Sequence, residues 1–423
     1  MGEPRHQRQR HRPRRLPHSA QHAPARHPGA ENAHSLPHPD AALRRRRGAE
    51  GGRDLPRLRS LRLRHRDDPG GRRRLPRHGD LSVAAERIGI GILGCGAVAK
   101  AHAEAIARVP ELRLVAAASR SRESAERLAA AYGVPAYDDL EAFFSNRALH
   151  AVTICTPSGT HAELGEAAAL VGKHVVVEKP IDVTLERADA LIAACDRAGR
   201  RLAVALQSRH LDAPRALKAA VEAGRLGRLV MASAYVKWHR TDAYYASAPW
   251  RGTLALDGGG ALINQAIHTV DLLRWIAGPV ERVSAFKDRL THPKIEGEDT
   301  LVAALRFASG ACGVIEAATS VYPGFKRRLE LTGTEGTAIL DGDNITVWEL
   351  RDGSPSPVPA APDISNAASN PMGIDVEGHR RVMEDFARAV LENRSPRVDG
   401  REGRLSLELV SALYAAAREG GAR

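Results

Sequence analysis

The chain of 423 residues has few aromatic side chains, few cysteines and no long apolar run. Aromatic residues make up 4% of it. Its four cysteines form no CxxC pair, which argues against a zinc cluster and for a reducing, cytoplasmic setting. No stretch approaches the roughly 18 consecutive apolar residues of a transmembrane helix, so we expect no membrane partner. The histidines show no HExxH-like spacing, and we expect no bound metal.

Lysine and aromatic residues are absent from the first eighty residues, which hold 21 arginines, 10 prolines, 9 histidines and 8 acidic residues. Such a segment cannot bury enough apolar surface to offset the entropy of ordering it, so residues 1–85 are predicted to be a disordered tail. Its composition is also typical of GC-rich DNA translated upstream of a true start, which we place near Val83. The alternative interpretation is an arm that binds nucleic acid or an anionic membrane.

The positive charge of the chain is confined to this tail. The formal net charge is +12, yet residues 81–423 are close to neutral because their acidic and basic residues balance. A compact basic body that binds nucleic acid is therefore disfavoured, and we expect no nucleic-acid partner.

A strand, a glycine turn and a helix follow the tail. The apolar run Ile88–Leu93 predicts a buried parallel strand, and it leads into GCGAVA at residues 94–99, a GxGxxA turn. Gly94 permits the tight turn, and Gly96 lets the backbone approach a pyrophosphate. The N–H groups of the following helix, at Ala97 and Val98, face the phosphates. The pattern predicts a dinucleotide site.

The end of the second strand indicates which dinucleotide binds. The strand Leu112–Ala118 is followed by Ser119 and Arg120, with no acidic residue before Glu123. An NAD enzyme usually carries Asp or Glu here for the ribose hydroxyls, whereas Ser and Arg suit a 2′-phosphate. The sequence therefore favours NADP over NAD. The alternative is that Arg120 stacks on adenine and either cofactor binds.

Strands and helices go on alternating up to residue 207, which predicts a doubly wound parallel sheet over residues 86–207. Ligands bind at the carboxyl ends of such strands, where Thr156-Pro157, Glu178-Lys179 and Gln207 are expected. Later segments, between residues 301 and 350, alternate apolar and polar side chains as antiparallel strands do. One helix is expected at Ala261–Ala277, and helices at 379–392 and 403–418 close the chain.

These motifs, in this order, resemble those of the Gfo/Idh/MocA oxidoreductase family, which includes glucose–fructose oxidoreductase and inositol dehydrogenase. The matching segments are GCGAVA at 94–99, TPSGTH at 156–161, EKP at 178–180, GG at 259–260 and NQAIHTVD at 264–271. The resemblance covers residues 88–423. It implies an N-terminal Rossmann domain and, over residues 208–423, a substrate-binding α/β domain with a large, mostly antiparallel sheet that often forms a homodimer or homotetramer.

The resemblance also implies a reaction. A hydride passes between NAD(P) and a hydroxyl or carbonyl of a sugar, sugar derivative, nucleotide sugar or cyclic polyol. Two other functions occur among relatives: a sugar sensor that binds the nucleotide without turnover, and a glycoside hydrolase that uses NAD transiently.

Three residues are the catalytic candidates. Lys179, at the end of an apolar strand, matches the lysine that bonds the reacting hydroxyl, although a surface lysine is the alternative. His268 matches the catalytic base, and its ordinary pKa near 6.5 suits proton transfer. Asn264, four residues earlier on the same helical face, stands where many inositol-dehydrogenase-like members carry Asp. This departure weakens an assignment to inositol oxidation. Asp271 either orients the helix or its histidine, or forms a structural salt bridge.

The remaining candidates line the two ligands. Cofactor contacts, besides the glycine turn, Ser119 and Arg120, are expected from Thr156, Pro157, His161, Glu178, Lys179 and Gln207. His161 has an equal alternative as a residue of the first helical turn. Substrate contacts are expected from Lys179, Arg209, Tyr245, Trp250, Arg251, Asn264 and His268. Residues 237–253 are dense in aromatics for this chain, and aromatic faces with Arg donors suit a sugar ring and an anionic group. The alternative is an edge strand and a loop packed under the sheet.

Overall fold

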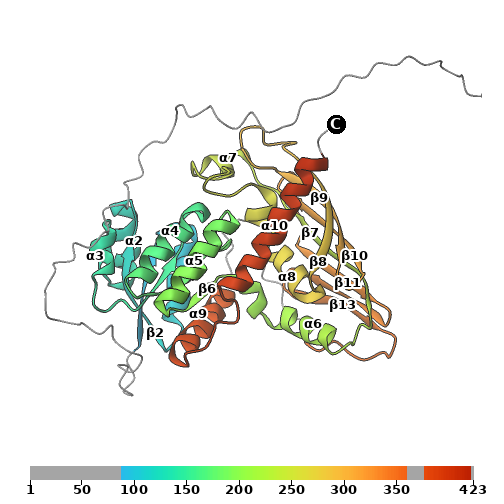
Figure 1. Ribbon diagram of the computed structural model, residues 1–423, viewed down its shortest axis with the longest axis horizontal. Coiled ribbons are helices and arrows are strands. Elements are labelled where there is room, and N and C mark those ends of the chain that lie inside the picture. Colours follow the sequence, from blue (N-terminus) through green and yellow to red (C-terminus); the bar gives the residue numbers. More distant parts are fainter. Residues whose placement is uncertain (1–86, 360–375, 421–423) are drawn as a thin grey trace, which may run out of the picture. The chain divides into compact units, whose positions relative to one another are not determined.

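The computed structural model describes residues 87–359 and 376–420 (Figure 1). The predictions for the tail 1–85, including its start near Val83, lie outside the described residues. Within the described ranges the chain builds two sheets, one parallel and one mostly antiparallel. This confirms the fold class expected from the sequence. No helix of the described residues is both long and apolar enough to cross a membrane.

The first sheet is parallel and has the strand order β3-β2-β1-β4-β5-β6. Its strands are β1 Ile88–Leu93, β2 Leu112–Ala118, β3 Ala136–Tyr137, β4 Ala151–Ile154, β5 His174–Val177 and β6 Leu202–Val204. Strands β1, β4 and β5 are buried along their whole length, as expected for strands covered on both faces.

Helices cover both faces of this sheet. They are α1 Ala97–Ala107, α2 Arg122–Tyr132, α3 Leu140–Phe144, α4 His161–Leu170 and α5 Leu185–Ala198. Helices α4 and α5 lie side by side (Figure 1), whereas α1 packs against α9, Val376–Leu391, from the far end of the chain. Side chains fix the helix starts: Ser121 and Thr184 each accept a hydrogen bond from a first-turn N–H.

The direction of strand order reverses between β1 and β4. In such sheets the crevice at the carboxyl ends of the two strands is the usual ligand site. Gly94 follows β1, and Cys155 and Thr156 follow β4. The fold therefore brings the glycine turn and the TP turn together at the position where a dinucleotide binds.

The second sheet has the order β13-β12-β11-β7-β10-β9-β8, and only its β7–β10 pair is parallel. Its strands are β7 Leu229–Lys237, β8 Val280–Asp288, β9 Thr300–Phe307, β10 Cys312–Ala318, β11 Arg328–Gly333, β12 Gly336–Asp341 and β13 Asn344–Leu350. Helices α6 (Asp212–Glu222) and α8 (Ile267–Ala277) pack on it. Helix α10, Gly400–Gly420, contacts α5 of the parallel part as well as α8 and β8 (Figure 1).

The structure departs from the expected helix at Ala261–Ala277. Residues Ala261–Ala266 form a π-helical turn, η4, and α8 begins only at Ile267. Glu298 anchors the start of this turn, because its backbone carbonyl and carboxylate accept hydrogen bonds from the N–H groups of Ala261 and Leu262 at 2.8 Å. Such turns occur frequently at functional sites.

Strands β7 and β8 were not expected from the sequence. The run LVMASAYVK of β7 has no clean alternation, because this strand lies in the middle of the sheet and is buried on parts of both faces. Residue 237 therefore ends a central strand, and residues Asp242–Ala246 after it form the short helix α7.

Candidate active site

The glycine turn after β1 has the shape of a phosphate cradle. Gly94 has a φ of +95°, and a Cβ there would come within 2.8 Å of the backbone of Cys155 and Thr156. Gly96 has an ordinary φ of −83°, and a Cβ on it would meet no protein atom within 4 Å. Gly94 is thus required by the fold, while the space above Gly96 is open to a ligand.

The start of α1 fits the same ligand. No side chain caps its N-terminal N–H groups, and Gly96 and Ala97 are exposed while Val98 is half-buried. Uncapped N–H groups at a helix N-terminus bind anions. The residues present therefore fit the pyrophosphate of a dinucleotide.

Ser119 and Arg120 lie where the sequence placed them, after β2. The Ser119 hydroxyl accepts a 3.4 Å hydrogen bond from Ser121 N–H, and Arg120 is exposed. Arg122 pairs with Glu126 and another acid, whereas Arg120 forms no ion pair within the described ranges.

His161 joins two of the motif turns. Its buried ring lies with Nδ1 2.8 Å from the Pro180 carbonyl oxygen and Nε2 3.0 Å from that of Thr156. A neutral imidazole donates through one nitrogen, and burial lowers the pKa of His161. The ring therefore donates to one of these two carbonyls and packs against the other, between the loops that follow β4 and β5. Thr156 and Pro157, on the first of these loops, are half-buried.

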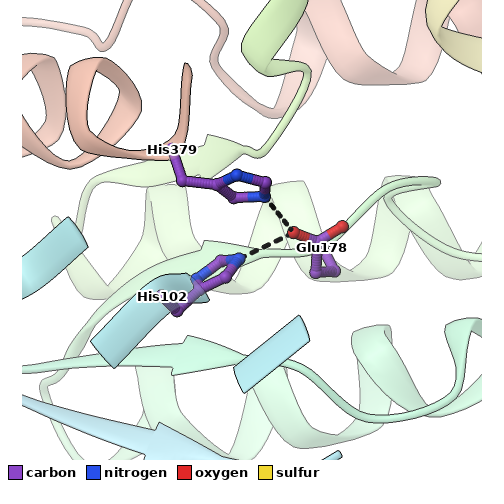
Figure 2. A group of neighbouring side chains, drawn as sticks. All are labelled: His102, Glu178 and His379. Atoms are coloured by element: carbon purple, nitrogen blue, oxygen red, sulfur yellow. Dashed lines mark hydrogen bonds and ion pairs between the residues drawn. The ribbon is translucent and has the colours of Figure 1, made fainter. Parts of the chain in front are cut away.

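Glu178 is enclosed by protein groups (Figure 2). One carboxylate oxygen lies 2.7 Å from Nε2 of His102 on α1 and 3.4 Å from Nε2 of His379 on α9. The other accepts the Lys179 N–H at 3.1 Å. Although burial raises it, hydrogen bonds from the two histidines hold the pKa of Glu178 well below its usual range. The Glu178 carboxylate thus fixes the turn that carries Lys179, and its expected contact with the cofactor stays a prediction.

The same three side chains are of types that bind metals. The possible ligand atoms of His102, Glu178 and His379 lie within 4.8 Å of one another. However, both imidazoles already share one carboxylate oxygen, and His102 Nδ1 contacts the Thr153 hydroxyl at 2.9 Å. A metal ion would have to displace these bonds, so the arrangement is that of a hydrogen-bonded cluster. Sequence spacing gave no signal for it, because its members lie on three distant segments.

Lys179 and His268, two of the catalytic candidates, act on each other electrostatically. The Lys179 ammonium donates to the Asn264 carbonyl oxygen at 2.8 Å. Burial lowers its pKa, and Arg251 and Arg240 lower it further. Burial and the Lys179 charge likewise hold the pKa of His268 well below its ordinary value, so its imidazole is neutral and able to accept a proton.

Nine buried side-chain polar atoms have no hydrogen-bond partner in the described part of the chain. Two of them, Nδ1 of His268 and Oε1 of Gln207, belong to residues expected at the site; Gln207 lies three residues after the end of β6. Native proteins leave few buried polar atoms unpaired, and those that remain often belong to binding sites. Both atoms fit a site that a bound nicotinamide and its substrate complete.

The Asn264 side chain is held at both ends. Its Nδ2 donates to the Asp257 carboxylate, and its Oδ1 accepts from Gln265 Nε2 at 2.7 Å. Asp257 is buried, which raises its pKa, and it also accepts the Gly252 N–H at 2.7 Å. Sequence reasoning missed Asp257, although a carboxylate directly before a run of three glycines was a usable signal.

The contacts of Arg209 in the described residues are all with protein groups. Its guanidinium is buried, with Nε 2.7 Å from Asp271 and Nη1 2.7 Å from Glu402 of α10. The hydroxyl of Ser406 also donates to Asp271. Asp271 therefore forms the structural salt bridge, one of its two expected roles, with the arginine expected to bind substrate.

The aromatic segment presents Tyr244 to the site more directly than Tyr245. The Tyr245 hydroxyl pairs with Thr319 at 2.8 Å, whereas the Tyr244 hydroxyl accepts from Gln265 Nε2 at 2.8 Å and Arg251 Nη1 at 2.7 Å. The Arg251 guanidinium also stacks on Trp250, 4.7 Å from the ring centre. Tyr244 and Gln265 were not singled out from the sequence, because which tyrosine of a pair faces a site depends on the short helix α7.

Comparisons with known proteins agree with this geometry. A model of the oxidoreductase family with an NAD-binding Rossmann fold matches residues 88–206, and one of the GFO/IDH/MocA C-terminal domain matches residues 215–339. D-apiose dehydrogenase of Paraburkholderia graminis is 28% identical, over 78% of this chain and 87% of that protein. Inositol 2-dehydrogenase of Rhizobium meliloti is 29% identical, over 78% of this chain and 96% of that protein.

A solved structure is more similar still. The WlbA dehydrogenase of Bordetella pertussis, in complex with NADH and UDP-GlcNAcA, is 35% identical and superimposes with a TM-score of 0.71. The match covers 79% of this chain and 98% of that one. Together with the two family models, this shows that the chain belongs to the Gfo/Idh/MocA family of NAD-binding, Rossmann-fold oxidoreductases.

Proposed function

We propose that the protein is a dehydrogenase that oxidises an alcohol of a sugar, sugar derivative, nucleotide sugar or cyclic polyol, with His268 as base. One observation carries the proposal: Nδ1 of His268 is buried and has no hydrogen-bond partner among the described residues. The positive charge of Lys179 acts on the same ring and, with burial, lowers its pKa. Similar proteins named for the oxidation of apiose and inositol support the substrate class.

The chemistry divides between the cofactor and the chain. When bound, the nicotinamide accepts the hydride from the carbon that bears the reacting hydroxyl. His268 takes the proton of that hydroxyl. The Lys179 ammonium, fixed by the Asn264 carbonyl, holds the oxygen and stabilises the negative charge that develops on it. Asp257 and Gln265 keep the turn of Asn264 in place.

Replacement of either residue tests these roles. We expect His268→Ala and Lys179→Ala each to lower kcat by about 100-fold or more, the usual contribution of a positioned proton-transfer group. The folded fraction, checked by thermal unfolding, serves as the control. Near-wild-type turnover in either variant contradicts the role assigned to that residue.

For the cofactor, we propose a preference for NADP over NAD. Ser119 and the exposed Arg120 support it, since a guanidinium outside any ion pair of the described residues suits a 2′-phosphate. Titration of the full chain with NADH and NADPH, followed by nicotinamide fluorescence, tests it. Tighter binding of NADPH is expected, and tighter binding of NADH contradicts the preference while leaving the dehydrogenase proposal intact.

We also propose that the chain forms a homo-oligomer through the face of the antiparallel sheet opposite α8. On strands β7, β8 and β9, Met231, Phe286 and Val302 are 53%, 63% and 45% exposed. Phe286 and Val302 are cross-strand neighbours, and exposed apolar patches on a sheet favour association. Sedimentation of the wild type should show a dimer or larger species, and Phe286→Glu should shift it toward monomer. A wild-type monomer contradicts this proposal.

A further inference from the structure

The surroundings of Lys179 contain more positive charge than one substrate hydroxyl requires. Arg240 and Arg251 both act on the Lys179 ammonium. The carboxylates that act on it are those of Glu178 and Asp257, so three cations face two anions and one positive charge is left over. Withdrawing cations from water is costly unless a counter-charge is supplied.

The guanidinium of Arg251 is fixed in an orientation that leaves it able to bind an anion. Its Nη1 donates to the Tyr244 hydroxyl at 2.7 Å and its Nε to Ser247 at 3.1 Å. The guanidinium stacks on Tyr244 at 4.3 Å and on Trp250 at 4.7 Å from the ring centres. No acidic residue of the described ranges lies within ion-pair distance of it, and its Nη2 forms no hydrogen bond with them. A guanidinium fixed in this way matches a carboxylate with little loss of entropy.

A chain of hydrogen bonds connects this guanidinium to the reacting groups. The Tyr244 hydroxyl accepts from Gln265 Nε2 at 2.8 Å, and the same Nε2 donates to Asn264 Oδ1 at 2.7 Å. The backbone carbonyl of Asn264 in turn holds Lys179. Gln265 Oε1 accepts from Arg240 Nη2 at 2.8 Å, so the second guanidinium lies on the same chain. Arg251, Arg240 and Lys179 thus belong to one hydrogen-bonded network.

We propose that the substrate is a sugar acid, whose carboxylate pairs with Arg251, with Arg240 adding positive charge, while a hydroxyl of the same sugar is oxidised at Lys179 and His268. This rests on the dehydrogenase function proposed above. A nucleotide pyrophosphate is also an oxyanion, but the unbroken hydrogen-bonded network from Lys179 to Arg251 favours an anion on the oxidised sugar itself. An acidic sugar is also the ligand bound to the similar WlbA dehydrogenase.

Matched pairs of acid and neutral sugars test the proposal. Cofactor reduction by the full chain is measured with D-glucuronate against D-glucose, and with UDP-GlcNAcA against UDP-GlcNAc. The acid of at least one pair should exceed its neutral partner in kcat/KM by about 100-fold, the value of a well-placed charged hydrogen bond of about 2.7 kcal/mol.

Arg251→Gln should lower that acid-to-neutral ratio by about tenfold or more, mainly through KM, because ground-state binding is lost. Arg113→Gln, which removes an exposed arginine of β2, is the matched control and should leave the ratio unchanged. An unchanged ratio in Arg251→Gln overturns the proposal, as does a neutral sugar that reacts as well as its acid.

The remaining outcomes distinguish a sugar carboxylate from a pyrophosphate as the anion. They also distinguish failure of the sugar-acid proposal from failure of the dehydrogenase proposal. Equal activity with both UDP sugars, lost equally in Arg251→Gln, assigns the arginine to the pyrophosphate and overturns the carboxylate. Reduction by neutral sugars alone overturns the acid inference and keeps the dehydrogenase. Cofactor reduction by no sugar at all overturns both.

Discussion

Glu178 shows at the residue scale how a buried charge supports catalysis without touching the reacting atoms. Its carboxylate is shared between His102 and His379, and its own backbone neighbour is Lys179. Its negative charge raises the pKa of both Lys179 and His268, opposing the larger effect of burial. We therefore interpret Glu178 as a positioning residue that sets the charge state of the pair.

Glu178→Gln should move the pH profile of the reaction. Glutamine keeps an acceptor oxygen for the histidines but removes the charge, so the pKa of Lys179 and that of His268 both fall further. Both limbs of the kcat/KM profile should then shift to lower pH. Measured profiles of wild type and variant check this. A purely structural role would lower activity without moving either limb, and that result contradicts the interpretation.

Whether the sequence indicates the role of a residue depends on how near its interaction partners lie in the chain. Lys179 and His268 could be singled out because each lies in a contiguous motif, and in the structure the Lys179 charge acts on His268; their catalytic roles stay proposals. The ion pairing of Arg209 could not be predicted, because its partner Glu402 lies 193 residues away and no local pattern records that contact. Asp257 was missed for a different reason: its partners Gly252 and Asn264 are near in the chain, but no motif contains all three residues.

At the scale of elements, the glycines of the β1–turn–α1 unit are required for two different reasons. Gly89 is packed so that a Cβ would approach the Ala148 carbonyl oxygen to 1.8 Å, whereas the space above Gly96 is open. The first glycine is therefore required by packing, and the second is required only by a ligand.

Gly96→Ala should weaken NADH binding by about tenfold or more, equal to about 1.4 kcal/mol, because the new methyl group occupies the pyrophosphate position. The free energy of unfolding should change little, since no protein atom is displaced. Gly89→Ala is the comparison and should lower stability instead. Urea unfolding and nicotinamide fluorescence measure the two effects, and unchanged NADH affinity in Gly96→Ala would falsify the placement of the cofactor.

Helix α8, which carries His268, is tied to its surroundings by a buried ion pair. Arg209 lies on η3, Gln207–His210, directly after the parallel sheet, and it binds Asp271 of α8 and Glu402 of α10. The pair thus joins three segments on which the site depends. The periodic apolar residues predicted α8, whereas its entry turn η4 is anchored by Glu298, 36 residues farther along the chain than Leu262, and has no local signal.

Arg209→Met should lower the free energy of unfolding by about 3–5 kcal/mol, because it leaves Asp271 as an uncompensated buried charge. Pairing it with Asp271→Leu should restore much of that stability. Chemical denaturation measures both. If Arg209 binds substrate, the milder Arg209→Lys raises KM with little loss of stability, a pattern that would contradict the structural role.

At the scale of the whole molecule, burial is the main cause of a lowered pKa at four histidines of the described residues: His102, His161, His210 and His268. For His210 the pKa falls to about 4. In the unfolded chain all four titrate near 6.5. Below that pH the unfolded chain binds more protons than the folded one, so stability falls as the pH decreases.

The free energy of unfolding should therefore be constant above about pH 7 and decrease below about pH 6.5, by up to about 1.4 kcal/mol per histidine and pH unit. Asp257 and Glu298, whose pKa burial raises, offset part of the loss at the acid end. Urea unfolding between about pH 7.5 and about pH 5 measures the slope. His210→Gln should flatten it, and a stability that holds or rises on acidification contradicts the account.

The most direct test of the whole account is net reduction of the cofactor by the full chain. NAD and NADP are each supplied with the acid and neutral sugars named above, and reduced nicotinamide and oxidised sugar are both quantified. The account predicts that the two accumulate in equal amounts and that His268→Ala loses about 100-fold in rate. A nucleotide that stays tightly bound and oxidised while no sugar reacts, or while a glycoside is cleaved without net reduction, would contradict it.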